Sequence, residues 1–221
     1  MRVLPPLLAA AAALLVPQAA QAAELTPLGT CYRSVDADTR EAVPVNAAGF
    51  TPGERVEVAI DGAVVETVTV LADGSIRGSV TAPYHAAGER PFTLTVTQVG
   101  QPANTASAVS RVAALGLKLK PRNAAPSKRV RIRGLGFIDG ERVYAHYVRK
   151  GKVRRTIDLG TPQGPCGRIS VRRRQIPVRR PALGRWVMQV DNSPAYSATP
   201  LGVAARWKIT VRRAPRSAPG R

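Results

Sequence analysis

The sequence has few of the residues on which most catalytic and metal sites depend. Its 221 positions hold two histidines, two cysteines and 5% aromatic residues. No His or Cys spacing fits a zinc site, and no Walker, dinucleotide-binding or Gly-x-Ser-x-Gly motif occurs. We therefore expect a protein that is not an enzyme, with no catalytic residues, no metal and no cofactor. A calcium loop built from Asp36, Asp38 and Glu41 is the alternative, although it lacks the glycine and terminal glutamate of an EF-hand.

Long apolar runs are absent after residue 23, so no later segment approaches the length of a transmembrane helix. Residues 1–23 differ from the rest. Met1-Arg2 is a positive start, a Leu- and Ala-rich stretch follows, and Ala20-Gln21-Ala22 fits a small-x-small cleavage site. This pattern predicts a secretory signal peptide. A membrane anchor is the alternative, but the apolar run is short and bounded by proline. We expect an exported protein that is secreted or associated with the cell envelope.

Helical periodicity is also absent. Instead, 19 glycines and 19 prolines punctuate short runs in which apolar residues alternate with others, as in residues 56–60 and 92–96. Asp61-Gly62 is a two-residue hairpin signal that follows one such run. This composition predicts many short strands joined by turns.

An internal repeat divides the chain. Residues 49–56, GFTPGERV, return as residues 136–143, GFIDGERV, with six of eight positions identical. The separation of 87 residues is the size of a small domain and far longer than a solenoid unit. We predict an all-β fold of two tandem immunoglobulin-like β-sandwiches after the signal peptide. Domain 1 would cover residues 24–113, domain 2 residues 114–211, and a disordered tail residues 212–221.

The repeated motif carries a family resemblance. Gly-Phe-x-Pro-Gly-Glu-x-Val, followed by an Asp-Gly turn and Ala-Asp-Gly-Ser at residues 72–75, resembles the bacterial immunoglobulin-like modules repeated in secreted and surface proteins. The second repeat, with Gly-Pro-Cys-Gly at residues 164–167 and its Arg-rich strands, resembles the C-terminal part of uncharacterised secreted actinobacterial proteins. The resemblance covers most of residues 40–212. It implies a β-sandwich and a non-catalytic role as a spacer, adhesion unit or binding unit.

The Gly-Phe motif is predicted to be structural. Phe50 and Phe137 would plug one end of each sandwich, and Trp186 would pack in the core of domain 2. The alternative is a ligand loop in which Glu54 and Glu141 make the contacts. We favour the structural interpretation, because the motif occurs in both repeats although their surfaces differ in charge.

The two cysteines are expected to pair, because exported proteins usually oxidise their cysteines. Cys31 is predicted in the first strand of domain 1 and Cys166 in a turn of domain 2, so their bond would hold the domains side by side. Two free thiols and a crosslink between chains are the alternatives. His85 and His146 are predicted to be solvated or locally bonded, with His146 pointing away from the apolar side of its strand.

The two halves of the chain carry net charges of opposite sign. Residues 24–113 contain six Arg and no Lys against ten acidic residues, a net charge of −4. Residues 114–221 contain 26 Lys and Arg against four acidic residues, a net charge of +22. So much positive charge repels itself unless an anionic partner offsets it, and domain 1 carries too little negative charge to do so.

We therefore predict that domain 2 binds an anionic polymer: a cell-wall phosphopolymer, an acidic polysaccharide or extracellular nucleic acid. An acidic protein is a further possible partner. The alternative is a structural or adhesion module of the cell surface with a protein partner and no polyanion site.

Three groups of cations are the candidate polyanion-binding residues. The first alternates with apolar residues on two strands predicted to share a sheet, the second lies on a hairpin tip around Gly151, and the third follows residue 171. Arginine suits phosphate and carboxylate groups because its guanidinium donates two parallel hydrogen bonds. The candidates are Lys118, Lys120, Arg131 and Arg133; Arg149, Lys150, Lys152, Arg154 and Arg155; and Arg172, Arg173, Arg174, Arg179 and Arg180.

Overall fold

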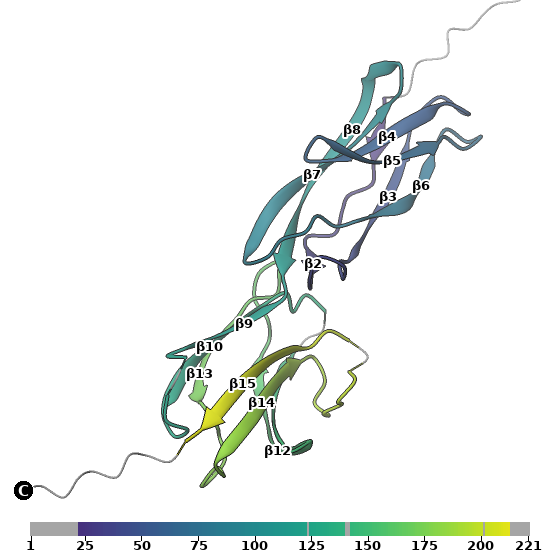
Figure 1. Cartoon of the computed structure of the whole chain (residues 1–221). Helices are drawn as coiled ribbons and strands as arrows, with labels where there is room; N and C mark the ends of the chain where they lie inside the picture. Colours follow the sequence, from purple (N-terminus) through teal and green to yellow (C-terminus); the bar gives the residue numbers. More distant parts are fainter. Residues whose placement is uncertain (1–21, 123, 140–141, 201, 213–221) are drawn as a thin grey trace, which may run out of the picture.

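Two β-sandwiches follow one another along the chain (Figure 1). The structure is a computed structural model that describes residues 22–122, 124–139, 142–200 and 202–212. These residues form fifteen strands, which confirms the predicted all-β fold. None of them belongs to a helix long and apolar enough to cross a membrane. The predicted signal peptide, apart from its last two positions, and the predicted tail from residue 213 lie outside the described residues.

Domain 1 packs a three-stranded sheet against a five-stranded sheet. Strand β3 alternates exposed and buried side chains along its whole length, because one face covers the core and the other meets solvent. Val43, Phe92 and Leu94 are among the buried core residues. In sheet order the strands are β1 (Glu24–Leu25), β3 (Ala42–Ala48) and β6 (Ile76–Thr81), then β2 (Tyr32–Ser34), β8 (Gln101–Ala114), β7 (Glu89–Gln98), β4 (Arg55–Ile60) and β5 (Ala63–Thr69).

Domain 2 repeats this arrangement with a three-stranded and a four-stranded sheet. Trp186 is buried in its core, as predicted. Its strands correspond in order to those of domain 1, without a counterpart of β2 among the described residues. In sheet order they are β13 (Ile169–Arg174), β10 (Arg129–Leu135) and β9 (Gly116–Lys120), then β12 (Lys152–Gly160), β11 (Val143–Arg149), β14 (Gly184–Asp191) and β15 (Ala205–Val211).

The repeated Gly-Phe motif forms the same turn in both domains. Gly49 and Gly136 have φ values of 88° and 86°, in the left-handed region that favours glycine. The phenylalanine that follows is buried in each domain, which confirms its predicted structural role. Its backbone N–H donates to a glycine carbonyl across the turn: Phe50 to Gly74 at 3.1 Å, and Phe137 to Gly167 at 3.2 Å.

A disulfide joins the domains. Cys31 and Cys166 are bonded across a sequence separation of 135 residues, which confirms the predicted pairing. The predicted side-by-side arrangement is wrong, because the two domains lie end to end (Figure 1). Cys166 lies in the predicted turn, but Cys31 lies just before β2 and not in the first strand. The first strand ends at Leu25 because Pro27 has no N–H to continue the ladder. The disulfide packs with Ala113 in a small apolar cluster of its own.

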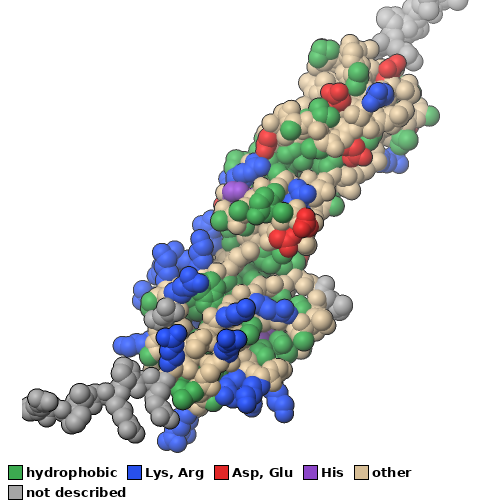
Figure 2. All heavy atoms as spheres, viewed as in Figure 1, with side chains coloured by type: hydrophobic (Ala, Val, Ile, Leu, Met, Phe, Trp, Pro, Cys, Tyr) green, Lys and Arg blue, Asp and Glu red, His purple; other side chains and the backbone are tan. Residues whose placement is uncertain are grey.

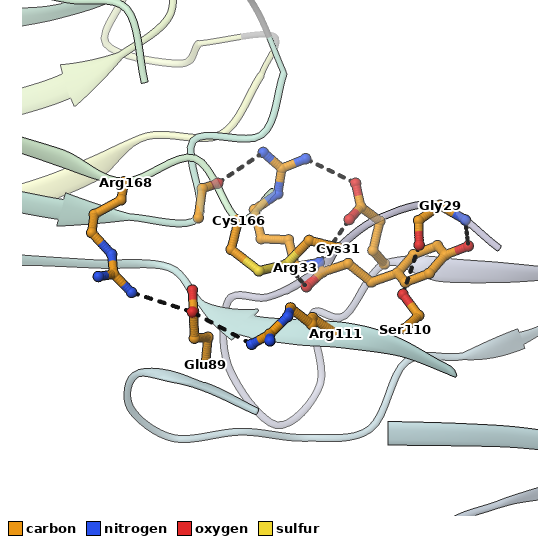
Figure 3. Close-up of a disulfide and its surroundings, with 11 residues drawn as sticks. Gly29, Cys31, Arg33, Glu89, Ser110, Arg111, Cys166 and Arg168 are labelled. Carbon is orange, nitrogen blue, oxygen red and sulfur yellow. Dashed lines mark hydrogen bonds and ion pairs between the residues drawn. A yellow bond between two sulfur atoms is a disulfide. The ribbon is translucent and has the colours of Figure 1, made fainter. Parts of the chain in front are cut away.

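An arginine from domain 1 reinforces this junction. The side chain of Arg33 is 7% exposed and reaches from β2 to the Gly-Phe turn of domain 2 (Figure 3). It donates to the Gly136 carbonyl at 3.4 Å and to the carboxylates of Glu41, at 2.9 Å, and Asp139. The domains are thus held by a covalent bond and by a buried, hydrogen-bonded charge, so their relative position is well defined.

Candidate functional site

The outer face of the β13-β10-β9 sheet carries a ladder of cations. Side chains alternate along a strand, so Val130 and Ile132 enter the core while their neighbours on β10 face outward. Residues directly opposed on adjacent strands have Cβ atoms about 4.5–5.5 Å apart. The opposed residues are Arg131 with Lys120 and Arg172, Arg133 with Lys118 and Ser170, and Arg129 with Arg174. We call the seven cations of this ladder the basic sheet face.

No described carboxylate balances this ladder: none of its seven side chains forms an ion pair within the described residues. Figure 2 shows Lys and Arg gathered over domain 2, while acidic side chains lie mainly over domain 1. Like charges that oppose each other directly destabilise a sheet. The basic sheet face therefore opposes folding, and local arrangements of that kind are typical of functional sites.

Strand alternation located most of this face. The prediction that Lys118, Lys120, Arg131 and Arg133 share a sheet is confirmed by the β9–β10 register. Sequence analysis missed Arg129, which stands two residues before Arg131 and is also exposed. The same alternation, followed for two more residues, identifies it.

The third predicted group does not form one cluster. Arg172 and Arg174 face outward, but Arg173 stands opposite Val130 on the core-facing side of the sheet. Successive strand residues point to opposite faces, so a run of three arginines cannot lie on one surface. Arg179 and Arg180 are exposed and lie outside the strands, in the segment that links β13 to β14.

The second predicted group surrounds the β11–β12 hairpin turn, in the other sheet of domain 2. Lys150 and Gly151 have φ values of 49° and 74°, as a type I′ turn requires. Arg149 donates to the Leu183 carbonyl at 2.9 Å, so part of its donor capacity is used within domain 2. Arg155 stands opposite Tyr147, a core residue, and so lies on the core-facing side of the sheet edge. The cations of the tip itself are Lys150, Lys152 and Arg154, which are exposed, as is Arg155.

A groove with a volume of about 660 Å³ lies at the end of the basic sheet face, next to domain 1. Three cations reach it: Lys118, Arg133 and Arg168. Arg168 forms an ion pair with Glu89 of domain 1 at 3.2 Å, and Arg111 lies 3.6 Å from the same carboxylate (Figure 3). The walls of the groove are formed by residues 86–88 of domain 1 and by residues 114–118, 133–135 and 168–170 of domain 2.

His146 is fully buried, so the prediction of a solvated side chain is wrong, whereas that of local bonding is correct. It lies on the outer face of its sheet, as alternation predicted, but its ring bonds with β12, with the end of β14 and with the segment that follows β14. Its Nδ1 lies 2.9 Å from Thr156 Oγ1. Its Nε2 lies 3.2 Å from Asp191 Oδ1 and donates to the Ser193 carbonyl at 3.1 Å. Sequence alternation places a side chain on one face of a sheet, but it does not show which segment, further along the chain, covers that face.

The loop proposed as a calcium alternative uses its carboxylates within the protein. Glu41 accepts hydrogen bonds from the backbone and side chain of Arg33 through both of its oxygens. Asp36 accepts from the backbone N–H groups of Thr39 and Asp38, and these bonds lower the pKa of Asp36. Among the described residues, no group of three or more His, Cys, Asp and Glu side chains is placed to hold a metal ion.

Comparison with known proteins finds resemblance at the level of structure. No protein-family model matches the chain, and no curated protein matches its sequence. The resemblance to secreted actinobacterial proteins therefore stays a prediction.

Similar solved structures include dimeric latent PorU from Porphyromonas gingivalis, at 12% identity and a TM-score of 0.31, with 87% of this chain and 20% of that chain covered. The N-terminal eight Ig domains of Down Syndrome Cell Adhesion Molecule match at 12% identity and a TM-score of 0.30, over 86% and 27% of the two chains. A bacterial ice-binding adhesin matches at 13% identity and a TM-score of 0.31, over 88% and 64%. The chain thus spans less than two thirds of each of these chains. Likeness at such TM-scores says nothing of what this protein binds.

Proposed function

We propose that the protein is a secreted, non-enzymatic β-sandwich protein whose domain 2 binds an anionic polymer through the basic sheet face. The observation that supports this is the cross-strand ladder of seven cations with no acidic partner among the described residues. A cell-wall phosphopolymer, an acidic polysaccharide or extracellular nucleic acid would each supply the regularly repeated negative charges that such a ladder needs. Domain 1 would serve as the scaffold that holds this surface.

The spacing of the ladder suits an extended chain. Alternate residues on a strand are about 6.8 Å apart, and adjacent strands are about 4.8 Å apart. Arg129, Arg131 and Arg133 therefore span about 14 Å along β10, with further cations on either side. A polymer that lies along β10 would meet several cations at once. Its binding would release several counterions and weaken steeply as salt increases.

The second candidate is a structural or adhesion module with a protein partner. Strand β5 favours it, because β5 lies at the edge of its sheet and is exposed over most of its length. Val64 and Val65 are 54% and 50% exposed there. An exposed edge strand can pair with a strand of another protein.

The test compares the full exported chain with two variants that each remove three positive charges. Binding to polyglycerol phosphate, polygalacturonate and single-stranded DNA is measured over a salt series. The variants are R131Q/R133Q/R172Q on the basic sheet face and K150Q/K152Q/R154Q on the hairpin tip.

We expect the sheet-face variant to lose at least about tenfold in affinity and roughly two units of the log–log salt slope, and the tip variant to lose much less. Equal losses would show that net charge, and not this surface, governs binding. Failure of the unaltered chain to bind any of the three polymers near physiological salt would overturn the proposal and favour the adhesion module.

A further inference from the structure

The groove between the domains has a different chemistry from the rest of the basic sheet face. Small side chains and bare backbone form much of its lining, including Ala86, Ala87, Gly88 and Gly116. Its volume of about 660 Å³ falls within the range of small-molecule sites, roughly 300–1,000 Å³. It therefore has room for a compact unit, whereas the open ladder offers only a flat surface.

Gly116 has no structural reason to lack a side chain. A Cβ at Gly134 would lie 2.7 Å from the Phe137 ring, so packing requires that glycine. A Cβ at Gly116 would meet no atom within 4 Å, and its φ lies outside the left-handed region. By strand alternation Gly116 lies on the same face as Lys118, so a side chain there would project into the groove. The absence of a side chain keeps this space open.

The groove is held in shape before any ligand arrives. One wall belongs to domain 1 and the others to domain 2, and the Cys31–Cys166 disulfide fixes the two relative to each other. Arg168 is held at the groove by Glu89, whose carboxylate also lies near Arg111. Two guanidinium groups therefore share one carboxylate, and positive charge is left over at the groove. A site that is already ordered loses less entropy on binding.

We infer that this groove seats one sugar unit of an acidic glycan, whose anionic group is held by Lys118, Arg133 and Arg168. The inference rests on the proposed function and selects acidic polysaccharide as the polymer class. The carbon-bound hydrogens of a sugar ring would pack against the alanine and glycine wall, while its carboxylate would accept hydrogen bonds from arginine. Among the described residues, the groove lining has no aromatic side chain on which a nucleobase could stack. A linear polyol phosphate has no ring to fill the groove.

The experiment uses the full exported chain and follows groove-residue signals in NMR titrations with trigalacturonate, neutral trigalactose and glucose 6-phosphate. Two variants fill the groove without changing charge: Gly116→Trp from domain 2 and Ala87→Trp from domain 1. Gly78→Trp is the matched control, since a Cβ at Gly78 in β6 also meets no atom within 4 Å. Binding of linear polyphosphate over a salt series is measured in parallel.

We expect trigalacturonate to bind at least about tenfold more tightly than trigalactose, and both groove-filling variants to lose at least about tenfold of that affinity. Their salt-dependent binding of polyphosphate should stay within about twofold of the unaltered chain. Binding of glucose 6-phosphate but not trigalacturonate would assign the groove to sugar phosphates and overturn a carboxylate ligand. Trigalacturonate binding that both variants retain, or none in the unaltered chain, would overturn the inference, while polyphosphate binding would still uphold the sheet-face function.

Discussion

The two domains have the same strand order and the same register in their small sheets, yet their outward faces differ. On β3 and β6 of domain 1, the outward pairs are Ala42–Thr81, Pro44–Ser79 and Asn46–Arg77. At the corresponding positions of β10 and β13, they are Arg129–Arg174, Arg131–Arg172 and Arg133–Ser170. The buried positions between them are apolar in both domains. The fold thus depends on the buried alternation and the turns, and the outward positions are available for function.

The largest expected effect concerns the link between the domains. The chain-entropy model gives about 5 kcal/mol for a bond that closes 135 residues. We expect the double variant Cys31→Ser/Cys166→Ser to lose about this much of its free energy of unfolding. The variant should unfold in two separate transitions, with the self-repelling domain 2 first. Scanning calorimetry would show this, and the unaltered chain under reducing conditions should behave alike. A single transition at the original temperature would mean that noncovalent contacts already couple the domains fully.

The next largest effect tests the shared turn. Gly167 has a φ of 59°, and a Cβ there would lie 2.2 Å from the Phe137 carbonyl. Its counterpart, Gly74, has a φ of 76°, and its Cβ would lie 3.0 Å from the Phe50 oxygen. We expect Gly167→Ala to cost roughly 3 kcal/mol or more and Gly74→Ala about 1 kcal/mol, measured by denaturant unfolding. Equal costs would show that the turn of domain 2 relaxes to admit a methyl group.

Local patterns predicted the parts of this structure that depend on neighbours in the sequence. Alternation and turn residues gave the strands, the Gly-Phe turn and the first four cations of the basic sheet face. They also identify Arg129, although the sequence analysis did not include it. The prediction for Arg173 is wrong, because a run of charged residues on a strand does not form one surface: each successive side chain points to the opposite face.

Features that depend on distant segments could not be predicted in this way. His146 is buried because it bonds with Asp191 and the Ser193 carbonyl, more than 40 positions later in the chain. Arg33 meets its domain 2 partners only because the domains are docked, and the groove exists for the same reason. Alternation places a side chain on a face, but it carries no information about what packs over that face.

The buried histidine network is a feature of domain 2 alone, since Ala59 occupies the position that corresponds to His146. We expect His146→Ala to cost about 2 kcal/mol, because it leaves the buried Asp191 carboxylate without one of its hydrogen-bond donors. Amide exchange should accelerate in residues 192–200 and stay unchanged in domain 1. Thr156→Val removes only the partner of Nδ1 and should cost less. Unchanged exchange in this segment would show that other contacts hold it in place.

The smallest effect concerns Tyr147, which occupies the position of Ile60 in domain 1. Its hydroxyl is fully buried and has no hydrogen-bond partner among the described residues. We expect Tyr147→Phe to stabilise domain 2 by about 1 kcal/mol, because it removes a buried polar group that gains nothing in return. The control, Tyr144→Phe on the same strand, removes a partly exposed hydroxyl and should change little.

A pH series separates this explanation from simple repacking. Burial raises the pKa of Tyr147, and the charge of Arg173 offsets part of that rise. The folded state therefore holds this proton more tightly than the unfolded state. The free energy of unfolding should not depend on this proton below the unfolded pKa of about 10, and it should fall as pH rises above that value. Tyr147→Phe should remove part of that fall, so its advantage over the unaltered chain should grow above pH 10 in denaturant titrations. An advantage that is the same at pH 7 and pH 11 would mean that packing, and not the orphaned hydroxyl, distinguishes the two residues.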